Sequence, residues 1–393
     1  MRVLISGAGI GGLTLAYWLH KTGHIPVVIE KAPNIRTDGY MIDFIGSSWD
    51  VANRMGLTPQ LEAAKHNIEE MVFKDAAGKT IACMPVEKLF HALRITDRSM
   101  TLDRRDLVEI LYHAIQSNVE VHFSTSLTTI CQFAQGVEVT ATGSQLDGTF
   151  DLVVGADGIH SNVRQLIFGS ENQYADYLGY YVAAFYTSPI KGSLETRCAV
   201  HMEPGVQFGI YPLSDGRWLV ISIYKSANEG HIPNDQRLSV LRSHLCNVGW
   251  ITQQVLDTLS PDTPIFMDTV TQIKMPQWSS SRVVMLGDAA YCPTLISGQG
   301  AGLAMAGAYF LAEELIQTKD VQMVLARYEE RLRPYVEKVQ TKARRFAPNF
   351  VPDSQLRIAM FNWAIRFIDL PPITHLFGKQ LSLDSIIPAS SAL

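Results

Sequence analysis

A glycine-rich turn near the start of the chain carries the first chemical signal. Gly7, Gly9 and Gly12 have the spacing G-x-G-x-x-G and follow the short apolar run RVLIS. Between a strand and a helix, such glycines permit a tight turn, let a pyrophosphate approach the backbone and let helix and strand pack closely. The free N–H groups and the dipole of that helix attract phosphate. Glu30 ends the next apolar run, where a carboxylate can bond a ribose hydroxyl. The spacing predicts a dinucleotide site, for NAD and FAD alike.

Two further motifs each place an aspartate and glycines directly after an apolar run. The run DLVV leads into GADGIHSNVR, which contains Asp157, and VVML leads into GDAAYCP, which contains Asp288. The carboxyl ends of strands form the usual ligand edge of an α/β sheet. The glycines of GQGAGL (298–303) then open a helix whose N-terminus suits the partial negative charge of a flavin pyrimidine edge. Each motif alone fits a simple turn, whereas all three in this order are far more specific.

The elements around these motifs predict an α/β protein. Residues 1–30 form a β-α-β unit, and 104–117 an amphipathic helix. Residues 176–225 alternate as in an antiparallel sheet, which differs in architecture from the first unit. The expected fold is a Rossmann-like (GR2-type) nucleotide-binding domain with an inserted antiparallel-sheet substrate domain and C-terminal helices.

Composition excludes several classes of protein. The chain has 393 residues, 47% hydrophobic and 18% charged, with a net charge of −5, which suits two to three folded domains and disfavours nucleic acid as the main partner. Its five cysteines lack C-x-x-C spacing, so we expect no disulfide framework, no metal site and a reducing, cytoplasmic location. The glycines begin too early for a signal peptide, and no run is long enough for a transmembrane helix. The sequence is compatible with a monomer and with a dimer.

The ordered trio of motifs resembles the class A flavoprotein monooxygenases of the para-hydroxybenzoate hydroxylase type, over residues 1–345. The first turn with Glu30 is similar to the family's nucleotide fingerprint, GADGIHSNVR to its DG motif and GDAAYCP to its GD motif. The resemblance implies FAD as cofactor and NAD(P)H and O2 as co-substrates. It further implies oxygen transfer from a flavin C4a-hydroperoxide to an electron-rich substrate, and hence no side-chain catalytic base.

The resemblance also assigns roles around the cofactor. Asp288 would bind a ribityl hydroxyl, Glu30 the adenosine ribose, and Arg104, spaced from Leu107 as R-x-x-L, the flavin region. Arg36 either approaches the pyrophosphate or is a solvated loop residue. The full expected set is Gly9, Gly12, Glu30, Lys31, Arg36, Arg104, Asp157, Asp288, Pro293, Gly298, Gly300, Ala301 and Gly302. One departure is that many members follow the last glycines with Asn and a later Asp, whereas this chain reads GLAMAG, so an altered contact near the flavin is expected.

The substrate is expected to bind between the flavin and the antiparallel sheet. Met41, Asp43 and Phe44 follow the second strand, where the family's loop lies beside the flavin, and Phe208 and Tyr211 belong to sheet strands, as does Phe185. Strand alternation directs about half of such aromatics to the other face. Phe361 completes the candidate set from the C-terminal region.

The helix expected at 355–370 is apolar apart from a narrow polar stripe, so it needs a partner. It could be a lid at the substrate entrance, as in tetracycline destructases, which are a branch of the family. That resemblance implies a polycyclic aromatic compound as one candidate substrate. It could equally dock on the FAD domain, or contact a membrane surface or a second subunit. The expected boundaries are FAD-binding parts at 1–70, 99–172 and 276–345, substrate-domain parts at 71–98 and 173–275, and the C-terminal helix at 346–393.

The resulting hypothesis is an FAD-dependent monooxygenase that hydroxylates an aromatic or polycyclic, tetracycline-like small molecule. A reductase or halogenase of the same fold is an alternative, although the halogenase motif W-x-W-x-I-P is absent from the sequence. A non-catalytic flavin-binding protein is another alternative, and it predicts a flavin that NAD(P)H does not reduce.

Overall fold

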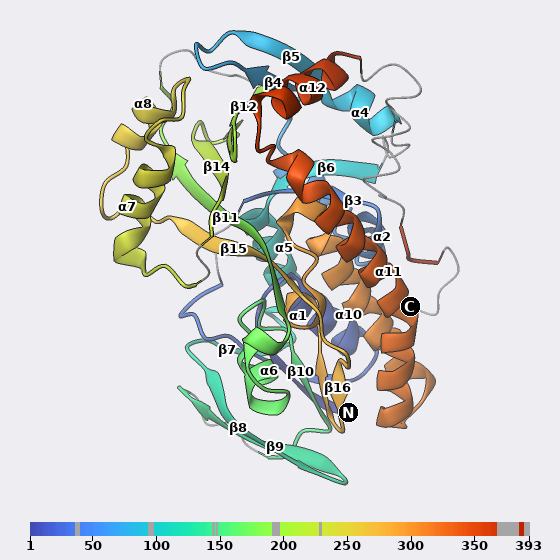
Figure 1. Ribbon diagram of the computed structural model, residues 1–393. Helices are drawn as coiled ribbons and strands as arrows, with labels where there is room; N and C mark the ends of the chain where they lie inside the picture. Colours follow the sequence, from blue (N-terminus) through green and yellow to red (C-terminus); the bar gives the residue numbers. More distant parts are fainter. Residues whose placement is uncertain are drawn as a thin grey trace.

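The first layer of the molecule is a mainly parallel sheet (Figure 1). The computed structural model describes residues 1–35, 40–92, 98–143, 146, 148–190, 197–227, 230–367 and 385–388. Six strands lie in the order β16-β17-β10-β1-β2-β7, and only β16 runs antiparallel to its neighbour. Their bounds are β1 Arg2–Ser6, β2 Ile25–Ile29, β7 Glu120–His122, β10 Leu152–Gly155, β16 Ser279–Ser280 and β17 Val283–Met285. The central strands are continuous apolar runs because helices cover both of their faces.

Helices from distant parts of the chain pack around this sheet. Helix α1 contacts both α10 and α5, and α10 in turn packs against α2 and α11. The bounds are α1 Ile10–Lys21, α2 Ser47–Arg54, α3 Thr58–Ala64, α5 Arg104–Ile115, α6 Asn162–Ile167, α9 Asp288–Tyr291, α10 Gly300–Gln317 and α11 Val321–Phe350. One hydrophobic core therefore joins the three predicted motifs into a single nucleotide-binding unit.

Gly12 lies where α1 crosses over the end of β1. A Cβ atom there would lie 2.0 Å from the carbonyl oxygen of Gly7 and 3.2 Å from Ile5. Gly11, its neighbour in the same helix, faces only ordinary contacts, the nearest at 3.5 Å from Ala304. The close approach of the Gly7 backbone therefore requires glycine at position 12, whereas the space around position 11 would admit a Cβ atom.

This difference gives a matched pair of stability predictions. Gly12→Ala is expected to lower the free energy of unfolding by about 1–3 kcal/mol, because the rigid backbone of Gly7 must move. Gly11→Ala is expected to be neutral or stabilising by up to about 1 kcal/mol, because alanine has the higher helix propensity. Urea unfolding of both variants measures the contrast, and equal effects would refute the packing role of Gly12.

The second layer is a seven-stranded sheet in the order β15-β11-β14-β13-β12-β4-β5. Its pairs are antiparallel except β12 with β4. The bounds are β4 Glu70–Lys74, β5 Thr80–Pro85, β11 Ala175–Thr187, β12 Arg197–Glu203, β13 Val206–Pro212, β14 Trp218–Lys225 and β15 Phe266–Ile273. Helices α7 (Asn234–Leu245) and α8 (Thr252–Asp257) cover one face with a separate core. The other face turns toward the β3–β6 ribbon of the nucleotide-binding unit.

Two short ribbons complete the sheets. Strand β3 (Met41–Ile45) pairs antiparallel with β6 (Ser99–Asp103), and β8 (Ser126–Phe133) pairs with β9 (Gly136–Thr142). In the first ribbon Met41 pairs with Asp103, the residue that immediately precedes α5. The β3–β6 ribbon therefore sets the start of α5 against the second sheet. The remaining elements are α4 (Val86–Ala92) and the 3-10 turns η2 (Glu171–Gln173) and η3 (Leu295–Ser297).

The C-terminal helix α12 (Gln355–Arg366) packs on the second sheet and not on the nucleotide-binding unit (Figure 1). Ile358 and Ile365 are buried against side chains of β4, β5 and β12. Trp363 and Met360 lie on the outward side, about 60% exposed. Docking on the FAD domain, one of the roles expected for this helix, is therefore wrong. In the part of the chain that the structure describes, no helix is long and apolar enough to cross a membrane.

Candidate functional site

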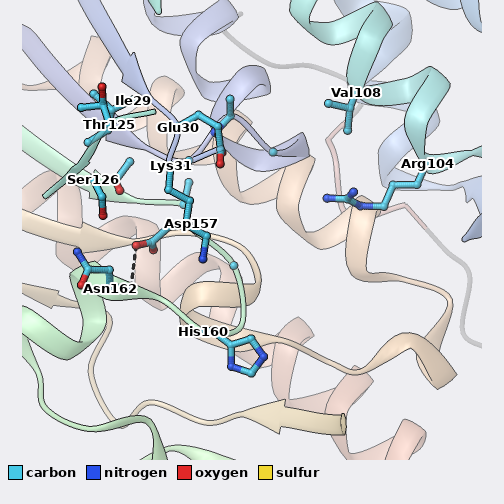
Figure 2. Close-up of a pocket in the computed structure, with 16 residues that line it drawn as sticks. Ile29, Glu30, Lys31, Arg104, Val108, Thr125, Ser126, Asp157, His160 and Asn162 are labelled. Atoms are coloured by element: carbon cyan, nitrogen blue, oxygen red, sulfur yellow. Dashed lines mark hydrogen bonds between the residues drawn. The ribbon is translucent and has the colours of Figure 1, made fainter. Parts of the chain in front are cut away.

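The first cavity of the site lies at the carboxyl ends of β1, β2 and β10. The β1–α1 turn, the end of β2 and the loop after β10 line it together with α5 (Figure 2). Figure 2 shows Arg104 reaching toward this space from α5, with Glu30, Lys31 and Asp157 across from it. The lining residues are Ser6, Gly7, Ala8, Gly9, Ile29, Glu30, Lys31, Arg104, Val108, Thr125, Ser126, Ala156, Asp157, Gly158, His160 and Asn162. The structure thus brings the first two motifs and Arg104 to one cavity.

Glu30 braces the glycine turn. Its carboxylate accepts hydrogen bonds from the backbone N–H groups of Ala8, at 3.0 Å, and Ala32, at 2.9 Å, and the side chain is buried. The Glu30 carboxylate also lines the first cavity, where a ribose hydroxyl would approach it. Glu30 therefore combines a structural role with the position expected of a ribose ligand.

The N-terminus of α1 is built to accept an anion. Among the described residues, no side chain caps α1 and no acidic residue stands in its first turn. Gly9 has no atom within 4 Å of where its Cβ would be, so the space beside the turn is open. Orphan N–H groups at the positive end of a helix dipole fit a pyrophosphate. The residues of this cavity therefore fit the nucleotide half of FAD, with Gly12 packed beneath the turn.

Asp157 accepts hydrogen bonds from other residues of the second motif. Its carboxylate accepts hydrogen bonds from the backbone N–H groups of Asn162, at 2.9 Å, and Val163, at 3.0 Å, and from the Ser161 hydroxyl. Burial raises the pKa of the Asp157 carboxyl, and these hydrogen bonds oppose the rise. Asp157 therefore holds the start of α6 in place while it borders the cavity.

Arg164 connects the second motif to the third. The side chain is completely buried, and its guanidinium donates to the carbonyl of Ala289 at 2.9 Å and to the Glu171 carboxylate at 2.9 Å. It also donates to the carbonyl of Ile159, in the DG turn. Because Ala289 directly follows Asp288, these bonds fix the two aspartate-bearing turns relative to each other.

Asp288 begins α9 at the end of β17 and borders the interior of the site. Its side chain is exposed at the cavity, where the surrounding protein atoms raise the pKa of the carboxyl and the nearby Arg104 guanidinium lowers it. Tyr40 is close to both groups: burial chiefly raises the pKa of its phenol, Asp288 adds to the rise and Arg104 opposes it. A carboxylate, a guanidinium and a phenol thus lie near one another, with Asp288 Oδ1 4.0 Å from the Cβ position of Gly300 at the start of α10, which fits the ribityl chain of FAD.

A second cavity lies at the N-terminus of α10. Its lining residues are Asp43, Ile45, Ser47, Ser48, Gly298, Gln299, Gly302, Leu303, Tyr335, Lys338, Val339, Ser385 and Ile386. Among the described residues, α10 has no side-chain cap and no acidic residue in its first turn, which contains Gly300 and Ala301. This positive helix end fits the electron-rich edge of an isoalloxazine ring.

The loop between α9 and α10 contains a strained residue. Thr294 has φ of 76°, a left-handed conformation that is unusual for a β-branched side chain. It follows Pro293, whose carbonyl accepts a hydrogen bond from Gln272. Strain of about 1–3 kcal/mol is commonly stored at functional sites, where surrounding structure enforces it. The proline thus stands in a loop held in a fixed shape between the two glycine-rich motifs.

Three of the predicted substrate residues come together. Met41 and Tyr211 belong to a cluster between β3 and the inner face of the second sheet. Asp43 borders the second cavity, and the surrounding protein raises the pKa of its carboxyl despite a hydrogen bond from Thr101. Burial raises the pKa of the Tyr211 phenol, and Asp43 is near enough to add to the rise. These side chains link the glycine turn of α10 to the second sheet.

The other aromatic candidates lie elsewhere. Phe208 is completely buried on the opposite face of the second sheet, against α7, α8 and Trp250, and Phe185 shares that core. Phe44 is completely buried in the core of the nucleotide-binding unit. Phe361 packs edge-on against Phe73 under α12, with ring centroids 5.6 Å apart. The expected substrate contacts of Phe208, Phe44 and Phe361 are therefore not supported by their positions, and Arg36 lies outside the described residues.

Sequence reasoning missed His160 and Tyr40. His160 lines the first cavity and bonds the carboxylates of Asp268, at 3.2 Å, and Glu171, at 3.0 Å, which raise its pKa to about 10. It stands inside the DG motif, three residues after Asp157, so the motif itself was the available signal. No pattern pointed to Tyr40, because only the folded chain brings it near Asp288 and Arg104.

A buried hydrogen bond joins the second sheet to the helix that carries Arg104. The Tyr186 hydroxyl donates to the Asp103 carboxylate at 2.8 Å, and Asp103 is completely buried. The other Asp103 oxygen caps α5 by accepting from the backbone N–H of Arg105 at 2.9 Å. This bond therefore fixes Arg104 relative to the sheet that faces the site.

Tyr186→Phe is expected to lower the free energy of unfolding by about 1–3 kcal/mol, because the buried Asp103 carboxylate loses a donor. FAD affinity should fall with it, since the start of α5 is less constrained. Tyr177→Phe on the same strand removes a bond to a backbone carbonyl and is the matched control. FAD titration and urea unfolding of both variants test the role, and equal FAD affinities would contradict it.

Comparison with known proteins agrees with this geometry. The sequence model of the family described as FAD binding domain matches residues 1–343. A flavin-dependent monooxygenase of Legionella longbeachae is 32% identical over 345 residues, covering 86% of each chain. An uncharacterized protein of Mycobacterium tuberculosis is 33% identical over 342 residues, 86% of this chain and 91% of that one. The fold and the relatives define a class, the flavoproteins with this FAD-binding domain.

Solved structures show the same architecture over nearly the whole chain. Tetracycline destructase Tet(51) has a TM-score of 0.81 and 26% identity, covering 99% of both chains. Klebsiella pneumoniae HpxO, solved with FAD and uric acid, has a TM-score of 0.80 and 22% identity, covering 98% of this chain and 97% of that one, and shares the fold. The chain belongs to the class A flavin-dependent monooxygenases, and its cofactor is FAD.

Proposed function

We propose that the protein uses NAD(P)H and O2 to hydroxylate an aromatic or polycyclic small molecule, with tetracycline-like compounds as the first class to test. The observation that carries this proposal is that Asp43 lines the cavity at the glycine turn of α10, while Met41 and Tyr211 pack together between β3 and the second sheet. FAD, when bound, supplies the redox chemistry, because it accepts a hydride and activates O2. The protein must position the substrate and keep water away.

The side chains support these tasks in different ways. The N-terminus of α1 and Arg104 would hold the cofactor's phosphates and ribityl region, and the α10 N-terminus would hold its ring. Apolar side chains of the second sheet, among them Leu219 and Ala184, exclude water from the inner face. Asp43 and Tyr211 offer polar atoms beside these apolar side chains, and the surrounding protein raises the pKa of both groups. They are suited to hydrogen-bond the oxygen substituents of a phenolic ring.

Similarity to known proteins gives the substrate class a second support. Tetracycline destructase Tet(55) is 28% identical with a TM-score of 0.81, covering 98% of both chains. In this chain α12 packs on β4, β5 and β12, at one end of the second sheet. A flat, multi-ring phenolic substrate fits a site bounded by a flavin ring on one side and a sheet on the other.

A stopped-flow panel tests the proposal. FAD-loaded protein is mixed with NADH or NADPH in the presence of simple phenols, heterocyclic aromatics and tetracyclines, and flavin reduction is followed by absorbance. We expect one class to accelerate reduction and to yield an oxygenated product. Reduction that no aromatic compound accelerates, without any oxygenated product, would contradict the proposed substrate class.

A further inference from the structure

The segment Ser385–Pro388 lies on the nucleotide-binding unit, far from α12, which precedes it in the chain (Figure 1). The backbone N–H of Ile386 donates to the Ser47 hydroxyl at 3.1 Å, and the Arg54 guanidinium donates to the Pro388 carbonyl. Ile387 is 8% exposed and belongs to the core of that unit. Two polar contacts and one buried anchor therefore hold this short segment against α2.

This segment also forms part of the second cavity. Ser385 and Ile386 line it together with Asp43 and two glycines of the α10 turn, Gly298 and Gly302. Gly302 packs beside α2, since its Cβ position lies 3.7 Å from the backbone nitrogen of Ser48. Ser47, whose hydroxyl accepts the hydrogen bond of Ile386, also adjoins this turn, because its Cβ lies 4.0 Å from the Cβ position of Gly302.

We propose that Ser385–Pro388 is a wall of the isoalloxazine compartment, which limits water access to the flavin and sets where the cavity ends. The proposal rests on the proposed function, in which FAD occupies both cavities. Ile386 is the residue whose side chain contributes apolar surface to that wall, while Ile387 anchors the segment. Excluding water from reduced flavin matters because reducing equivalents otherwise leave as hydrogen peroxide.

Two variants test the wall separately from folding. Ile386→Ala keeps the anchor and trims the wall, and a chain ending at Asp384 removes the segment entirely. Each FAD-loaded variant is examined by quenching of flavin fluorescence with the neutral quencher acrylamide. A second readout is the share of consumed NAD(P)H recovered as hydrogen peroxide. We expect both readouts to rise several-fold in the shortened chain and to rise less in Ile386→Ala.

Met360→Ala is the matched control, because this side chain lies on the exposed side of α12, away from the second cavity. Acrylamide should quench the flavin fluorescence of this variant to the same extent as that of the unaltered protein. If Ile386→Ala and the shortened chain retain FAD and both quench like this control, the wall is refuted while the FAD-dependent function stands. If the unaltered protein retains no FAD, the proposed function itself fails.

Discussion

Replacing Arg164 by alanine is expected to lower the free energy of unfolding by about 2–4 kcal/mol, because two backbone carbonyls lose a charged donor and a large buried side chain is removed. The change leaves the carbonyls of Ile159 and Ala289 without this donor, whereas the Glu171 carboxylate, about one-third exposed, keeps its hydrogen bond to His160. The side chain is completely buried, so water cannot readily take its place. The turns bearing Asp157 and Asp288 should then separate, and FAD binding should weaken as well.

Urea unfolding of the FAD-free protein isolates the stability effect from cofactor binding. Arg357→Ala is the control, since its ion pair with Asp353 is about half exposed and such pairs contribute at most about 1 kcal/mol. Arg164→Lys should recover only part of the loss, because an ammonium cannot reproduce the planar fork. A loss in Arg164→Ala no larger than in Arg357→Ala would show that the link between the motifs is dispensable.

Asp288→Ala is expected to weaken FAD binding about tenfold to a hundredfold, the size of one charge-assisted hydrogen bond. The Asp288 side chain is exposed at the cavity, and the surrounding protein raises the pKa of its carboxyl, so the protein without FAD gains little stability from it. The free energy of unfolding without FAD should therefore stay unchanged or rise. Loss of affinity without loss of stability distinguishes a ligand residue from a structural one such as Arg164.

Equilibrium dialysis with FAD measures this affinity directly. Asp288→Asn retains an acceptor oxygen and should lose less affinity than Asp288→Ala. Asp353→Ala, at an exposed carboxylate beyond the site, should bind FAD like the unaltered protein. Unchanged FAD occupancy in Asp288→Ala would refute the ribityl contact.

The sequence predicted the fold class and the three motifs because their signals are local. A glycine turn, a strand and a following acid are adjacent along the chain, as with Gly7, Gly9 and Glu30. The family's order of motifs then supplied the architecture, which the structure confirms. Arg164 shows the limit of local signals, because its bond to Ala289 joins residues 125 positions apart.

The substrate-facing aromatics were the weakest predictions, and strand geometry explains why. Phe208 and Tyr211 are three residues apart on β13, so the two-residue period of a strand directs them to opposite faces. Asp43 and Phe44 are adjacent on β3, and one borders the second cavity while the other fills the core. The residue types do not indicate which face of the second sheet borders the site, because both faces are apolar.

We expect this chain to transfer one oxygen atom from O2 to an aromatic substrate when FAD is bound. The most direct test supplies FAD-loaded protein with NAD(P)H, the substrate selected by the stopped-flow panel and isotopically labelled O2. Mass spectrometry of the product should then show one labelled oxygen atom, and Asp288→Ala should yield less product at limiting FAD. A colourless protein that retains no FAD, or a product whose new oxygen comes from water, would contradict the account.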